Sequence, residues 1–91
     1  MFVNICYDIE NDKTRTRLAH KLKDFGPRVQ KSVFEADVSK EEFIKLNKML
    51  AAVKLDKNDS IRIYVLCQEC LKKIKILGKG EITKDKDYYI A

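Results

Sequence analysis

Alternating apolar and polar residues open the chain and predict a half-buried β-strand that ends in a turn, over residues 3–12. One side of the strand is apolar and carries Val3, Ile5, Tyr7 and Ile9. The other side is polar and places Asp8 near the end of the strand. A strand-end carboxylate commonly caps the following turn, and its oxygens are also the ligands that a hard metal ion prefers.

Helical spacing of apolar residues predicts a helix over residues 12–25, with Asn11 or Asp12 as the N-cap. The apolar positions are Leu18, Leu22 and Phe25. The pair Gly26-Pro27 is expected to end the helix, because glycine takes a left-handed cap and proline cannot continue the helix.

A basic stripe lies on another face of the same predicted helix. Lys13, Arg17 and Lys21 follow one another at intervals of four residues and begin beside the Asp8 turn. Two interpretations remain open: the stripe is an ordinary solvated helix face, or it contacts a polyanion.

Residues 28–38 alternate as a strand, but the alternation changes phase. The first phase runs to Val33 and the second begins at Phe34. One inserted residue would produce this change, so we predict a single strand with a β-bulge or kink near residues 32–34.

A capping box, Ser39 with Glu42, predicts the start of a second helix. Its buried stripe would contain Phe43, Leu46, Leu50 and Val53. The pattern then predicts a strand over residues 60–66, a short strand over residues 73–77, a turn over residues 78–80 and an edge strand at 88–90.

This order of elements predicts an α+β fold, a ferredoxin-like βαββαβ sandwich with both helices on one face of the sheet. We assign residues 1–80 to this domain and residues 81–91 to a C-terminal tail whose edge strand pairs with a partner subunit. The helices would cover Val3, Ile5, Ile61, Ile63 and Val65. The open face would carry Asn4, Cys6, Asp8, Arg62 and Tyr64, and it favours a homodimer that packs through the sheets.

Size and charge favour partners. A chain of 91 residues buries only about 60–65% of the surface that its unfolded form exposes, so association would help to stabilise it. Nineteen Lys and Arg against fourteen Asp and Glu give a net charge of +5, which favours nucleic acid. The sequence has no membrane-spanning apolar run and no signal-peptide pattern, so we expect a cytoplasmic protein with no membrane partner.

Cysteine and histidine offer weaker candidates. Cys67-Gln68-Glu69-Cys70 is a C-x-x-C motif, and it could form half of a zinc site that a dimer completes. Its place after a late strand argues against a redox function, because a thioredoxin-type motif opens a helix after the first strand of its fold. The simpler interpretation is two small thiols that are buried or half-buried, and an odd total of three cysteines argues against a disulfide framework. His20 is expected to be a surface residue.

Asp8 is the strongest candidate for a chemical role. Mg²⁺ can be held by one or two carboxylates together with the phosphate that it activates. A dimer axis through the open sheet faces would bring two copies of Asp8 together. Arg15, Arg17 and Arg28 could then hold a phosphate backbone on either side.

Three segments resemble the signature blocks of Cas2, a family of small CRISPR-associated proteins. They are Tyr7–Asp12, Phe25–Glu35 and Asp59–Leu66, in family order and at family spacing. The resemblance implies a ferredoxin-like homodimer whose C-terminal strand pairs with the partner's sheet. It also implies a role in spacer acquisition beside the CRISPR integrase, and Mg²⁺-dependent nuclease activity on single-stranded RNA or double-stranded DNA.

The resemblance also implies functions for particular residues. The family's strand-end aspartate falls on Asp8, preceded by Tyr7, and its helix arginines fall on Arg15 and Arg17. Its arginine after the turn falls on Arg28, and its aromatic residue on Phe34. We therefore predict Asp8 as the metal ligand, and Asp8, Tyr7, Arg17, Arg28 and Phe34 as catalytic residues. The predicted nucleic-acid-binding residues are Lys13, Arg15, Arg17, Lys21 and Arg28.

Two functions of different classes fit these residues. In one, paired Asp8 carboxylates hold Mg²⁺ for slow phosphodiester hydrolysis. In the other, the dimer is a non-catalytic scaffold that holds duplex DNA for the integrase, and Asp8 is structural. The sequence leaves both open.

Overall fold

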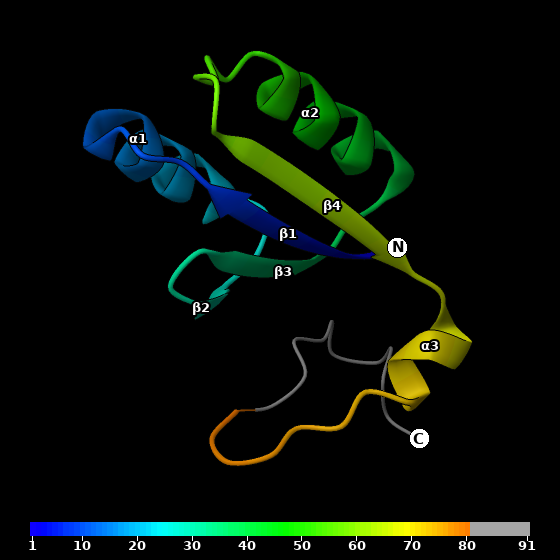
Figure 1. The fold of residues 1–91 in the computed structure, drawn as a ribbon. Helices are drawn as coiled ribbons and strands as arrows, with labels where there is room; N and C mark the ends of the chain where they lie inside the picture. The colour runs from blue at the N-terminus through cyan, green and yellow to red at the C-terminus, as the bar shows by residue number, and fades with distance from the viewer. Residues whose placement is uncertain (81–91) are drawn as a thin grey trace.

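The computed structural model describes residues 1–80 and has the predicted ferredoxin-like fold (Figure 1). Its elements are β1 (Phe2–Asp8), α1 (Asp12–Leu22), β2 (Arg28–Gln30), β3 (Val33–Asp37), α2 (Lys40–Ala51), β4 (Ser60–Leu66) and α3 (Gln68–Lys72). The strands form one antiparallel sheet in the order β2-β3-β1-β4. Helices α1 and α2 lie over one face of the sheet, and α3 lies beyond the end of β4 (Figure 1).

The segment predicted as one bulged strand is instead a β-hairpin. Strands β2 and β3 are joined by a turn at Lys31 and Ser32, and their register is irregular between Arg28 and Gln30. The prediction of a single strand was wrong because a two-residue turn changes the phase of alternation just as an inserted residue does.

The strand predicted over residues 73–77 is also absent. The part of the chain that the structure describes has no strand after β4, and a short helix, α3, begins at Gln68. The hairpin supplies the fourth strand of the sheet in its place, so the fold is correct although one of its strands was assigned to the wrong segment. The edge strand predicted at residues 88–90 lies outside the described residues.

The register confirms which strand positions face the helices. Val3 pairs with Val65, Ile5 with Ile63, and Tyr7 with Ile61, so these residues share one side of the sheet. Val3 and Ile5 are fully buried, as predicted. Val65 is on the same side but is 53% exposed, so the prediction that the helices cover it was wrong. The core between sheet and helices is formed mainly by Val3, Ile5, Tyr7, Ile9, Leu18, Leu22, Phe34, Ala36, Val38, Leu46 and Leu50.

Both predicted helix starts are confirmed. The Asn11 side chain accepts a 2.9 Å hydrogen bond from the Thr14 N–H at the start of α1. Ser39 and Glu42 form the full capping box of α2, and the hydrogen bonds from Ser39 lower the pKa of the Glu42 carboxyl.

The end of α1 differs from the prediction. The helix ends at Leu22, before Phe25, and positive φ angles among the described residues occur only at Gly78 and Gly80. Gly26 therefore is not a left-handed cap. A Cβ atom at Gly26 would lie 2.0 Å from the Glu35 carbonyl oxygen, so this position requires glycine because β3 passes against it.

No helix within residues 1–80 is both long enough and apolar enough to cross a membrane.

Candidate functional site

Asp8 is the last residue of β1 and is exposed. It pairs with Ser60 of β4, and alternation along β1 places it on the face opposite α1 and α2, together with Asn4 and Cys6. Cys6 on this face is half-buried and donates a 3.0 Å hydrogen bond to Asn4 Oδ1. The predicted position of Asp8 on the open face is therefore confirmed.

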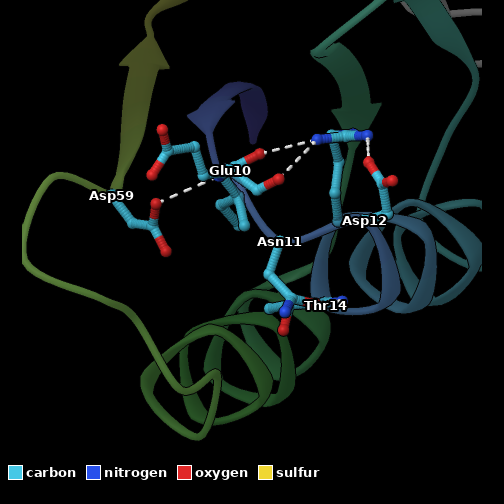
Figure 2. Close-up of polar contacts among 7 residues, drawn as sticks. Glu10, Asn11, Asp12, Thr14 and Asp59 are labelled. Atoms are coloured by element: carbon cyan, nitrogen blue, oxygen red, sulfur yellow. Dashed lines mark hydrogen bonds and ion pairs between the residues drawn. The ribbon is translucent and has the colours of Figure 1, made fainter.

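Arg15 fixes the turn that follows Asp8. Its Nη1 donates to the carbonyl oxygens of Ile9, at 2.9 Å, and Glu10, at 3.2 Å. Its Nη2 forms an ion pair with Asp12, and Figure 2 shows all three contacts. Arg15 was predicted to contact nucleic acid, but here its guanidinium is directed to the backbone of its own loop.

Asp59 ties the same turn to the loop before β4. Its Oδ1 accepts a 3.1 Å hydrogen bond from the Glu10 N–H, which Figure 2 shows. Its Oδ2 accepts a 2.9 Å hydrogen bond from the Asp56 N–H within its own loop. Sequence reasoning missed this function. The available signal was an aspartate directly before the strand that pairs with β1, in a loop rich in turn-forming residues.

Tyr7, Phe34 and Arg28 form a separate group on the helix side of the sheet. Tyr7 and Phe34 are only 5% and 1% exposed, and their stacked ring centroids are 6.3 Å apart. The Arg28 guanidinium carbon lies 5.4 Å from the centroid of the Phe34 ring, a cation–π contact. The structure thus brings three of the predicted catalytic residues together, but places them on the side of the sheet opposite Asp8.

Basic side chains line a surface hollow of about 330 Å³ between α1 and the β2–β3 hairpin. We call this hollow the basic hollow. Its lining residues are Tyr7, Arg15, Thr16, Ala19, His20, Lys23, Arg28 and Lys31. His20 is exposed as predicted, but its place among four Lys and Arg side chains was not foreseen, because the α1 residues and the hairpin meet only in the fold.

The predicted basic stripe also exists on α1. Lys13, Arg17 and Lys21 are all exposed. Lys13 and Arg17 line a second hollow, of about 490 Å³, together with Asp12, Thr16 and His20. His20 borders both hollows, so the two basic surfaces of α1 are adjacent.

A single copy of the described chain does not supply a full metal-binding set. Residues 1–80 contain no cluster of three or more His, Cys, Asp or Glu side chains that could hold a metal ion. Asp8 therefore belongs to no such cluster within residues 1–80, and a site that contains two Asp8 carboxylates would need a second copy.

The two thiols of the C-x-x-C motif are exposed, so the prediction that they are buried or half-buried was wrong. Cys67 is the N-cap of α3, and Cys70 lies inside this helix. The thiols are exposed because the chain leaves the sheet after Leu66 and begins α3 at Gln68.

Comparison with known proteins identifies the family. The family model described as CRISPR associated protein Cas2 matches residues 1–74. The chain belongs to the Cas2 family. A relative from Synechocystis sp., named CRISPR-associated endoribonuclease Cas2 3, is 40% identical over 80 residues, which are 88% of this chain and 87% of the relative.

Solved Cas2 structures share the fold. The crystal structure of Streptococcus pyogenes Cas2 at pH 6.5 has a TM-score of 0.72 at 34% identity, covering 86% of this chain and all of that chain. A chain of a partial Cas6-RT-Cas1–Cas2 complex has a TM-score of 0.63 at 31% identity, and the match covers 84% of this chain and 89% of that chain. Family membership and the ferredoxin-like fold are thus shown by sequence and structure together.

Proposed function

We propose that this Cas2 chain is a metal-dependent phosphodiesterase of CRISPR spacer acquisition, which acts as a homodimer on single-stranded RNA or double-stranded DNA. The observation that carries the proposal is the exposed Asp8 carboxylate at the end of β1, on the face that α1 and α2 leave open. The endoribonuclease name of its relatives supports this class of reaction.

The proposed metal is Mg²⁺, held between the Asp8 carboxylates of two copies. A carboxylate fits this ion, since Mg²⁺ prefers oxygen ligands, keeps several waters and needs only one or two protein carboxylates besides the substrate phosphate. When bound there, Mg²⁺ would lower the pKa of a coordinated water and neutralise charge on the scissile phosphate.

The loop contacts around Asp8 support a preorganised carboxylate. Arg15 and Asp59 hold the backbone of residues 9–10, directly after Asp8, from two sides. A ligand on a fixed backbone loses less conformational entropy on binding a metal or phosphate. Buried Tyr7 and Phe34 serve in this proposal as packing that positions Arg28, since their rings offer little surface to a substrate.

The basic hollow and the basic stripe would bind the phosphate backbone. Both surfaces combine flexible lysines with arginines, which are the groups that neutralise phosphates and release counterions. Arg15 contributes less than predicted here, because its guanidinium already donates to two carbonyl oxygens.

One observation favours the second candidate, a scaffold that holds duplex DNA for the integrase. Arg28 lies with Phe34 and Tyr7 on the helix side of the sheet, whereas Asp8 lies on the open face. Phosphates bound in the basic hollow would therefore lie on the other side of the sheet from Asp8 of the same copy, an arrangement that suits binding without cleavage. The neighbour described as a Cas6-RT-Cas1–Cas2 complex is consistent with a binding role beside Cas1.

Cleavage of labelled RNA and duplex DNA distinguishes the two candidates. The nuclease proposal predicts that Asp8→Ala loses cleavage, that a chelator abolishes wild-type cleavage and that Mg²⁺ restores it. Glu10→Ala is the matched control, because it removes a neighbouring exposed carboxylate but keeps the backbone N–H that binds Asp59. Unchanged cleavage by a folded Asp8→Ala protein would exclude Asp8 as the catalytic group. Duplex binding by the wild type without Mg²⁺-dependent cleavage would favour the scaffold.

A further inference from the structure

The C-x-x-C motif places two exposed thiols next to each other at the start of α3. The Sγ atoms of Cys67 and Cys70 are 3.4 Å apart, within hydrogen-bonding distance. Cys67 has an extended backbone before the helix, and Cys70 follows within the first helical turn, so their side chains meet across that turn. An S–S bond of about 2.05 Å would require the sulfurs to approach by only about 1.4 Å.

The pKa values of the two thiols are shifted in opposite directions. The nearby backbone N–H and side chain of Cys70 both lower the pKa of the Cys67 thiol. The hydrogen bond to Cys67 raises the pKa of the Cys70 thiol. Cys67 therefore carries the larger thiolate fraction, and the thiolate is the nucleophile in disulfide exchange.

We propose that Cys67 and Cys70 form a reversible dithiol–disulfide couple that exchanges with small disulfides of the glutathione class. First, the Cys67 thiolate attacks one sulfur of the small disulfide, so that a mixed disulfide forms and one small thiolate leaves. Second, Cys70 gives up its proton and its sulfur attacks the Cys67 sulfur, which releases the second small thiolate. Both cysteines are oxidised, and two electrons and two protons convert the small disulfide into two thiols.

A metal site accounts for the pair less well. Structural zinc takes four ligands, but within the described residues no third His, Cys, Asp or Glu joins the two thiols in a group that could hold a metal. The other cysteine, Cys6, lies on β1 and bonds Asn4. Two adjacent exposed thiols with no third such ligand within residues 1–80 suit exchange chemistry, and this inference does not depend on the function of Asp8.

The couple lies where the chain leaves the sheet. Cys67 directly follows the last residue of β4, and α3 is anchored by Leu71, which is 5% exposed. A bond between Cys67 and Cys70 would therefore link the end of β4 covalently to the first turn of α3. Oxidation should slow hydrogen exchange of the α3 amides relative to the reduced protein.

Equilibration in glutathione buffers tests the proposal on the full-length chain. Mass spectrometry after alkylation would measure the fraction with an intrachain Cys67–Cys70 bond. For such a bond the oxidised-to-reduced ratio follows [GSSG]/[GSH]², so tenfold dilution of total glutathione at a fixed ratio should raise it about tenfold. A mixed disulfide follows [GSSG]/[GSH] and would not change on dilution, a result that would overturn the proposal.

Variants that each replace one cysteine separate the two steps of the exchange. Cys70→Ser should accumulate the mixed disulfide on Cys67, Cys67→Ser should lose the intrachain bond, and Cys6→Ser should behave as wild type. Wild-type disulfides that join two chains would contradict the proposal. Protection of both thiols by Zn²⁺ at one ion per two chains would also contradict it, since that stoichiometry indicates a shared metal site.

Discussion

The backbone N–H of Glu10 donates a 3.1 Å hydrogen bond to Oδ1 of Asp59, which joins the turn after Asp8 to the loop that leads into β4 (Figure 2). The second oxygen of Asp59 binds the Asp56 N–H, so one carboxylate holds two loops. The position of Asp8 therefore depends on a residue 51 positions away in the sequence.

Replacing Asp59 should affect both stability and cleavage. Asp59→Ala leaves two N–H donors without their acceptor, so we expect a loss of about 1–2 kcal/mol in the free energy of unfolding and weaker Mg²⁺-dependent cleavage. Urea denaturation and the cleavage assay measure the two effects. Asp56→Ala is the control, because it removes a carboxylate from the same loop but keeps the N–H that Asp59 accepts. Equal losses in both variants would show that the tether is unimportant.

Gly26 should tolerate no side chain. In Gly26→Ala the new Cβ would meet the Glu35 carbonyl oxygen and the Ala36 Cα atom, so β3 or the preceding turn must move. We expect a destabilisation of about 1–3 kcal/mol in denaturant unfolding. Asp24→Ala, at an exposed position of the same turn, should change stability by less than about 0.5 kcal/mol. Wild-type stability of Gly26→Ala would contradict the close approach.

The capping box should make stability depend on pH. Hydrogen bonds from Ser39 lower the pKa of folded Glu42 below its unfolded value, so the ionised carboxylate stabilises the fold at neutral pH. This contribution is fully present above the unfolded pKa, about 4.3, and is lost as the pH falls through the lower folded value. Thermal unfolding of wild type and Glu42→Gln should therefore differ at pH 7 and converge in acid. A difference that persists unchanged to pH 2 would contradict this assignment, and Glu41→Gln is the matched control.

Charge in the basic hollow should govern duplex binding. Arg28→Ala and Lys31→Ala remove one cation each from the lining of the hollow. If each contacts one phosphate, the slope of log K against log salt should decrease by about 0.9 per variant. Lys45→Ala, which removes an exposed charge from α2, should leave the slope unchanged. Equal slopes in the wild type and all three variants would exclude the basic hollow as the binding surface.

Local patterns predicted much of the fold. The N-caps Asn11 and Ser39, the bounds of β4 and the two faces of β1 depend on residues close together in the sequence, and all are confirmed. Residues 28–38 were misjudged because a tight turn and a bulge produce the same change of phase. Gly26 was predicted to serve as a left-handed helix cap. The structure shows that glycine is needed there because β3 passes too close for a side chain.

The candidate site was predictable only in part. Asp8 could be placed on the open face by alternation alone, and this placement is confirmed. The contacts of Arg15 with its own loop and of Asp59 with Glu10 could not be predicted, because the sequence does not give side-chain direction in a turn or the approach of two distant loops. The separation of Arg28 from Asp8 likewise follows from the hairpin, which sequence reasoning had taken for one strand.

Mixed dimers test most directly whether two copies of Asp8 share one metal ion. Wild-type and Asp8→Ala chains, co-refolded in equal amounts, should form about one quarter wild-type dimers if association is random. Shared ligation predicts Mg²⁺-dependent cleavage at about one quarter of the rate of an all-wild-type sample at the same total concentration. Cleavage at about one half of that rate would show that each Asp8 acts alone, and would contradict the shared site.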